Sequence, residues 1–256
     1  MRAIARPFCA LGWAVAVLAI AIGARGLSGA GPAGERVSRT FPATPGRGVT
    51  VRATVADVAV RGADRRDVTV GVTTRGSAEG ASLLPIEIGE ADGAVTVSVV
   101  QPEGRREPGP AASIDVDVPA DLAFVDVDLF EGRVELSGLR RRVAVRVERG
   151  PISARNVAGR VRLETVSGSI RLDGADLPED GMLRCRVFNG DVDVRLARRP
   201  ADARILVLTL NGEIASSLPL THRTGVGPRF AEATVGSGTR VLSIDVVRGN
   251  IRLSSP

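Results

Sequence analysis

Two pairs of aspartates are the residues of this sequence best suited to carry out chemistry. Asp126 and Asp128 alternate with apolar residues in one segment, and Asp191 and Asp193 do so in another. Paired carboxylates can act as acid and base on a polysaccharide. Sugar rings usually pack on aromatic side chains, however, and the only aromatic residues after residue 30 are Phe41, Phe124, Phe130, Phe188 and Phe230. We therefore interpret the four aspartates as parts of solvated strand faces, and keep a polysaccharide-active β-helix enzyme as the less favoured alternative.

The other reactive residue types are too isolated to form a catalytic constellation. His222 is the only histidine and falls in an expected loop. Residues 126–132 resemble a calcium-binding loop only in part, because Phe130 stands at a ligand position and Gly132 comes one place late. Cys185 occupies an apolar position of an expected strand and is interpreted as a buried, unreactive thiol. We therefore expect no catalytic, cofactor-binding or metal-binding residues, no cofactor and no enzymatic activity.

The charge balance argues against a nucleic-acid partner. The chain has 34 basic and 29 acidic residues, and every basic residue is an arginine. Three of these arginines and no acidic residue lie in the first 30 positions, which leaves 34 − 3 = 31 basic residues against 29 acidic ones. Both signs are interspersed, and few aromatic side chains are present to stack on bases. The run Arg140–Arg142 is interpreted as a solvated turn.

The first 30 residues have the composition of a signal peptide or an N-terminal membrane anchor. Arg2 and Arg6 precede an apolar run over residues 8–24, and small residues follow at Ser28–Ala30. We expect cleavage near residue 31, with cleavage after Ala24 as the competing choice; an uncleaved run 8–24 would attach the protein to the membrane. Either alternative places the rest of the chain outside the cytoplasm. Residues 31–48 are rich in Pro and Gly and are predicted to be a linker.

The rest of the chain repeats one pattern around six glycines. Gly132, Gly150, Gly168, Gly190, Gly212 and Gly249 follow one another at spacings of 18, 18, 22, 22 and 37 residues. The positions seven, five and three before each glycine, and two and four after it, hold 27 apolar residues out of 30. Thr165, Thr209 and Ser216 are the three exceptions. This alternation predicts two or three short strands per unit, with a bend at the glycine and one strand face buried on both sides of it.

An all-β fold follows, for which a β-solenoid, a single-stranded β-helix-like stack of 18–22-residue coils, is the favoured arrangement. An antiparallel hairpin array or a β-sandwich remains the alternative. A two-residue hairpin turn needs positive φ at both central residues, yet Glu131, Arg149 and Arg248 precede three of the glycines. These residue types favour a corner made by glycine alone. The predicted repeat domain covers residues 49–256, with irregular first coils in 49–112 and regular coils in 113–256.

The repeated phrases TVSGSIRL, VFNGDVDV, TLNGEIAS and VVRGNIRL resemble a bacterial family of β-strand-repeat proteins. It is known as the "putative adhesin" family, a domain of unknown function, and the resemblance covers roughly residues 49–256. The units around Gly132 (LFEG) and Gly150 (VERG) depart from its usual Asn/Ser-Gly corner. The resemblance implies an extracytoplasmic all-β solenoid without an established activity.

The expected function is therefore that of a non-enzymatic, secreted or cell-envelope β-repeat protein, an adhesin-like binding or scaffold module. Its partner would be an unidentified protein or polymer of the envelope or cell surface. The alternative is an envelope partner of a membrane-bound sensor or regulator.

Two structural expectations test this interpretation. If coils stack in parallel register, Arg146 lies between Asp128 and Glu164, and Glu164 lies between Arg146 and Arg186. The strand at 205–210 is apolar on both faces, so we expect the insertion 218–233 to cover its outer face, including Leu206 and Leu208.

Overall fold

Twenty strands and no helix make up the part of the chain that the computed structural model describes, namely residues 36–74, 85–100, 112–223 and 227–256. The all-β prediction is confirmed. The expected signal peptide or anchor and the loop 101–111 lie outside these residues. No helix among the described residues is long and apolar enough to cross a membrane. All described residues belong to one compact unit, 32–256.

The strands form two ladders of pairing that share one long strand, β2 (Gly48–Ala63). Ladder B contains, in spatial order, β4 (Ile86–Ala91), β5 (Ala94–Val99), β2, β7 (Phe124–Glu131), β9 (Arg142–Arg149), β11 (Arg160–Ser167), β13 (Met182–Asn189), β19 (Val241–Arg248), β15 (Ala203–Asn211), β18 (Arg229–Val235) and β17 (Thr221–Arg223). Ladder A contains β1 (Arg36–Pro42), β3 (Asp67–Thr74), β6 (Ala112–Pro119), β2, β8 (Val134–Ser137), β10 (Ile152–Arg155), β12 (Ile170–Ala175), β14 (Val192–Leu196), β20 (Ile251–Ser254) and β16 (Ile214–Ser216).

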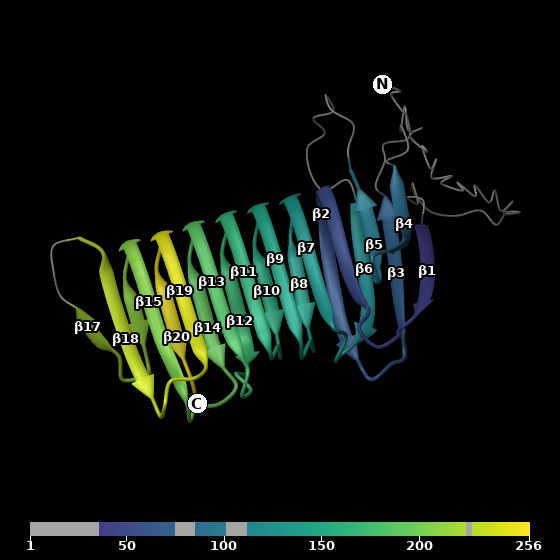
Figure 1. The fold of residues 1–256 in the computed structure, drawn as a ribbon. Helices are drawn as coiled ribbons and strands as arrows, with labels where there is room; N and C mark the ends of the chain where they lie inside the picture. Colours follow the sequence, from purple (N-terminus) through teal and green to yellow (C-terminus); the bar gives the residue numbers. More distant parts are fainter. Residues whose placement is uncertain (1–35, 75–84, 101–111, 224–226) are drawn as a thin grey trace, which may run out of the picture. The chain divides into compact units, whose positions relative to one another are not determined.

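Each repeat unit contributes one strand to each ladder, and neighbouring units pair in parallel (Figure 1). The predicted register is confirmed. Arg146 pairs with Asp128 on one side and with Glu164 on the other, and Glu164 pairs next with Arg186. Equivalent positions of successive units therefore form continuous rows across both ladders, about 4.8 Å apart from strand to strand.

The glycine corners are required because the backbones of neighbouring units touch there. Gly150 has a φ of 141°, and a Cβ atom on it would lie 1.8 Å from the carbonyl oxygen of Gly132. At Gly190 the φ is 140° and the corresponding distance to the Gly168 oxygen is 2.0 Å. Among the described residues, Asp92 and Asn156 are the only non-glycine residues with positive φ. The residue before each corner glycine therefore has negative φ and is not part of a type I′ turn. The sequence predicted this result.

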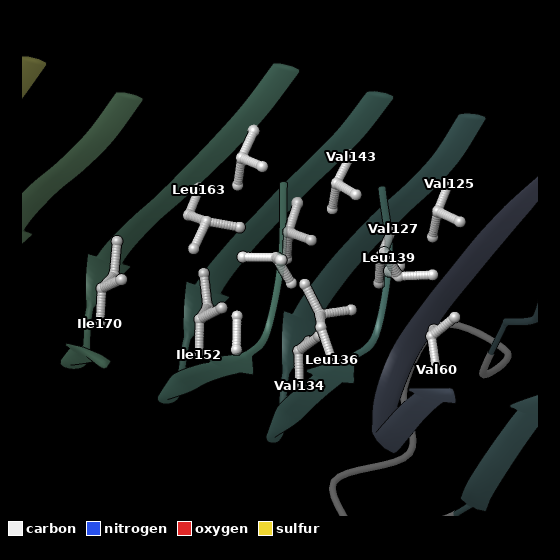
Figure 2. Packing of buried hydrophobic residues seen from close by; sticks show 14 of the residues in the cluster. Val60, Val125, Val127, Val134, Leu136, Leu139, Val143, Ile152, Leu163 and Ile170 are labelled. Carbon is white, nitrogen blue, oxygen red and sulfur yellow. The ribbon is translucent and has the colours of Figure 1, made fainter. Parts of the chain in front are cut away.

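The core is an aliphatic layer enclosed between the two ladders. Val125, Val143 and Leu163 extend from ladder B, and Val134 and Ile152 approach from ladder A (Figure 2). All five side chains are at most 2 % exposed. Two of the three polar exceptions are buried and hydrogen-bonded: Thr165 Oγ1 donates to the carbonyl of Gly150, and Thr209 Oγ1 donates to the carbonyl of Gly249. In both cases the buried hydroxyl has a hydrogen-bond acceptor, the glycine carbonyl of the neighbouring unit. This explains why a threonine can stand at a position where the other units carry an apolar residue.

The first strands differ from the later units. Strand β2 passes from ladder B to ladder A without a glycine, with the change near Ala56 and Asp57. Strands β3 and β6 pair antiparallel, as do β4 and β5. The expected linker 31–48 contains β1, which pairs antiparallel with β3, so that prediction is wrong for residues 36–42. The alternation of Val37 and Phe41 with polar residues allows this strand to rest partly buried against the core.

The last two units do not follow chain order. Strand β19 lies between β13 and β15, and β20 lies between β14 and β16, so the C-terminal unit is inserted between two earlier ones (Figure 1). The insertion after β16 does not cover the outer face of β15 either. Its strand β18 instead pairs antiparallel with the free edge of β15, beside that face and not over it, and Leu206 and Leu208 are partly buried. That prediction is wrong because the unpaired backbone edge, and not only the apolar face, required a partner.

Candidate functional site

The structure separates the carboxylates that could have formed an acid–base pair. Asp126 and Asp128 lie on β7 in ladder B, whereas Asp191 and Asp193 lie at β14 in ladder A. Asp126 Oδ2 is 3.5 Å from Arg142 Nη2, and Asp193 Oδ2 is 3.8 Å from Arg171 Nη2. These carboxylates are members of charge rows and do not converge on a common point.

The remaining reactive residues are also apart from one another. His222 is exposed on the short strand β17. Cys185 is fully buried in β13, and this burial raises the pKa of its thiol to about 12. Glu131 lies in a row with Arg149, 3.8 Å away, rather than beside Asp126 and Asp128 in a loop. Within the described part of the chain, no three His, Cys, Asp or Glu side chains gather closely enough to hold a metal ion.

An open groove crosses the outer face of ladder A. It has a volume of about 720 Å³ and crosses six strands, from β8 to β16. A second hollow of about 550 Å³ adjoins it and shares Ser153, Arg171, Asp193 and Arg252 with it. Small side chains make the groove possible, because Ser153, Ser169 and Ala215 stand where other units carry long ones. We call the two hollows together the ladder A groove.

The groove presents charges of both signs in a regular pattern. Arg171 on β12 pairs with Asp193 on β14, which pairs in turn with Arg252 on β20. Two residues further along the same strands, Asp173 on β12 pairs with Arg195 on β14. The ion pairs are long, at 3.8 to 4.0 Å, and the arginine side chains are about 70 % exposed. Such exposed pairs contribute little stability, so the charges remain available to another molecule.

The corner side of the groove is held by side-chain hydrogen bonds that run along the stack. Asp191 Oδ1 accepts a hydrogen bond from the backbone N–H of Asn250 at 2.7 Å. Asn250 Oδ1 accepts one from the backbone N–H of Glu213 at 3.0 Å. Each of these residues directly follows a corner glycine. Their bonds fix the rim of the groove to a rigid element, as a preformed binding surface requires.

The lining of the ladder A groove is polar and charged. None of the side chains that line the groove is aromatic, and they include serine hydroxyls, guanidinium groups and carboxylates. Sequence reasoning did not identify this surface. A signal was present, since the groove residues are the outward positions three and five after each glycine, where Ser, Arg and Asp replace the apolar pattern.

Comparison with known proteins supports the fold. No family model matches the chain, and no curated protein matches it in sequence. A crystal structure of a "putative cell adhesion protein" from Clostridium sporogenes is similar over 87 % of this chain and 100 % of its own, with a TM-score of 0.51 and 10 % identity. A "putative adhesin" from Bacteroides fragilis covers 86 % of this chain and 97 % of its own, with a TM-score of 0.36 and 11 % identity. At these identities the first similarity speaks for a shared fold, and the second carries no argument.

Proposed function

We propose that this chain is a non-enzymatic, extracytoplasmic β-solenoid that binds a protein or polymer of the cell envelope or cell surface through the ladder A groove. Parallel pairing of equivalent positions in successive units supports the solenoid. The apolar run at residues 8–24 after Arg2 and Arg6 supports export or membrane attachment. The name of the similar Clostridium sporogenes protein agrees with a role in adhesion.

The groove is the observation that carries the proposal. It runs across the strands, so a ligand that lies in it meets a new strand about every 4.8 Å. Arg171 and Arg252 are two strands apart and therefore offer like charges about 10 Å apart along this path. A periodic polar chain, such as a glycan or an extended peptide, can match such a spacing with repeated weak contacts that add up.

The second candidate is an envelope partner of a membrane-bound sensor or regulator. The same apolar run 8–24 favours it, since an uncleaved segment would hold the groove near the membrane. The two candidates differ in the molecule that occupies the groove, and this molecule can be captured in the cell.

In-cell photo-crosslinking tests the groove directly. A photoreactive phenylalanine analogue replaces Ser153, which lies in both hollows of the ladder A groove. The matched control carries the analogue at Asp121, an exposed residue in the turn between β6 and β7. We expect a discrete crosslinked species from position 153 and none from position 121, and mass spectrometry then identifies the attached molecule.

The outcomes separate the alternatives. A surface polymer or secreted protein attached at position 153 supports the adhesion module, whereas an integral membrane protein supports the sensor partner. Absence of a crosslink at position 153, or equal crosslinking at both positions, would show that the groove is not the binding surface.

A further inference from the structure

The outer face of ladder B carries a row of charges that alternate in sign over six strands. In spatial order the row consists of Arg52, Asp128, Arg146, Glu164, Arg186 and Asp245. The sequence alone showed the four middle members, and the spatial order of the strands adds one at each end. Insertion of β19 next to β13 is what brings Asp245 beside Arg186, where chain order would have placed Leu208.

The end of this row at Arg52 and Asp128 is less well paired than its centre. Glu164 has three arginine partners, at 2.8 Å from Arg162, 3.4 Å from Arg146 and 3.9 Å from Arg186. Asp128 and Arg52 are exposed and take part in no ion pair recorded among the described residues. The row thus has charges that are free to interact with a complementary surface.

An exposed apolar row runs beside these charges, formed by the residues two positions before each corner glycine. Phe130, Val166, Phe188 and Leu210 in this row are 46 %, 44 %, 48 % and 43 % exposed. Val247 adds a half-buried member, and Glu148 is the charged exception. Between the two rows lies a hollow of about 170 Å³, which is bordered by Glu164, Val166 and Phe188 among others. An exposed phenylalanine such as Phe188 beside a hollow is typical of a docking surface.

We propose that this face binds a second copy of the chain around a two-fold axis that runs parallel to the strands and lies between β9 and β11. Such an axis reverses the order of the strands. A row of six alternating charges then meets its own reverse with opposite signs at every position. Arg146 faces Glu164 of the partner, Asp128 faces Arg186, and Arg52 faces Asp245.

One contact in each neighbouring row fits the same axis. In the apolar row, Phe130 comes to lie opposite Phe188 of the partner, next to the hollow. In the row on the other side of the charges, Asp126 on β7 comes to lie opposite Arg184 of the partner's β13. An axis through a strand would instead place Glu164 or Arg146 against its own copy. An axis between β11 and β13 would place Arg162 against Arg184. The charges therefore select one register.

A charge-swap series tests this interface without relying on the groove. We expect the purified wild-type chain to sediment as a dimer and Arg146→Glu to weaken the dimer at least about tenfold, because two Glu–Glu contacts form around the axis. The double variant Arg146→Glu/Glu164→Arg restores opposite charges between the copies, although it leaves like charges adjacent within each copy. Only intermolecular pairing therefore explains a recovered dimer. Arg140→Glu, on an exposed turn, serves as the matched control and should remain dimeric.

Sedimentation velocity measures the oligomeric state of each variant. Reaction of the Cys185 thiol with a thiol reagent checks folding, because this thiol is fully buried in the folded chain and becomes accessible only on unfolding. A wild-type chain that is monomeric at all accessible concentrations would overturn the proposal. A double variant that stays as weakly associated as Arg146→Glu would overturn it too. Neither result affects the crosslink expected from position 153, so failure of the dimer and failure of the groove are distinguishable.

Discussion

The middle units and the C-terminal end obey the same residue pattern but are assembled differently. From β7 to β14, units that follow one another in the chain pair with one another. From β15 to β20 the chain first forms a unit at a distance, reverses through β17 and β18, and returns to fill the space between. The difference teaches that the period specifies the shape of a unit, while the edges and the insertion decide where that unit is placed.

Removal of the inserted unit should break the C-terminal end and leave the middle intact. Deletion of residues 239–256 takes away the buried side chains Leu242, Ile244, Val246, Ile251 and Leu253. Burial of five such side chains contributes roughly 7–15 kcal/mol, so β15, β16 and β18 should lose their attachment to β13 and β14. We expect limited proteolysis followed by mass spectrometry to show cleavage within 203–238 and protection of 124–196.

The control is deletion of Ser255 and Pro256 alone, which removes one hydrogen bond from Ser255 to Ser217 and should leave proteolysis unchanged. Equal protection of 203–238 in the long deletion would mean that the C-terminal unit does not connect the two regions.

A methyl group at a corner should destabilise the stack more than one in an edge strand. In Gly190→Ala the new Cβ meets the Gly168 oxygen at a φ of 140°, so we expect a loss of at least about 3 kcal/mol or failure to fold. Gly89→Ala, in β4, meets no atom within 4 Å and should change stability by less than about 1 kcal/mol in either direction. Urea unfolding of both variants measures the difference, and similar midpoints would contradict the close approach of neighbouring corners.

Asp202 fastens the turn that sends the chain from β18 back to β19. Its carboxylate accepts hydrogen bonds from the hydroxyl of Ser237 and from the backbone N–H groups of Gly238 and Thr239. The hydroxyl of Thr239 is a further donor, and these bonds lower the pKa of Asp202 to about 2. Because the folded pKa lies below the unfolded value of about 3.9, the stabilisation is complete above pH 4 and is lost as the pH falls toward 2.

We therefore expect Asp202→Asn to be less stable than wild type at pH 7, and the difference to shrink between pH 4 and pH 2. Urea midpoints of the two proteins across this range provide the measurement. A difference that stays constant over the range would show that the carboxylate charge plays no part in the turn.

The smallest expected effect compares the same substitution in both regions. Thr165→Val removes the 3.2 Å bond to Gly150, and Thr209→Val removes the 2.9 Å bond to Gly249. Each variant leaves a glycine carbonyl without its hydroxyl donor but adds an apolar contact, so losses of about 0.5–1.5 kcal/mol are expected. The shorter bond should make Thr209→Val the larger loss. Denaturant unfolding gives both values, and stabilisation by either change would show that these hydroxyls are not needed.

The sequence predicted what depends on neighbours along the chain. The alternation around Gly132, Gly150 and Gly168 was sufficient for the strands, the buried face and the register, because side-chain direction and the glycine corner are local properties. The position of β19 could not be read in this way, since Leu242 and Ile244 fit any unit of the stack equally well. The groove escaped notice because it arises from small residues on adjacent strands, such as Ser153 and Ala215, which are distant in sequence.

Thiol crosslinking across ladder B tests the strand order most directly. In a Cys9→Ser background, Arg186→Cys/Asp245→Cys places two thiols on adjacent strands, about 4.8 Å apart along the row. Arg186→Cys/Leu208→Cys places them two strands apart, at about twice that distance, because β19 lies between. With the shortest bismethanethiosulfonate reagent, we expect rapid intramolecular crosslinking of the 186–245 pair and slow or absent crosslinking of the 186–208 pair. Preferential crosslinking of the 186–208 pair would contradict the inserted C-terminal unit, and with it the six-charge row that depends on it.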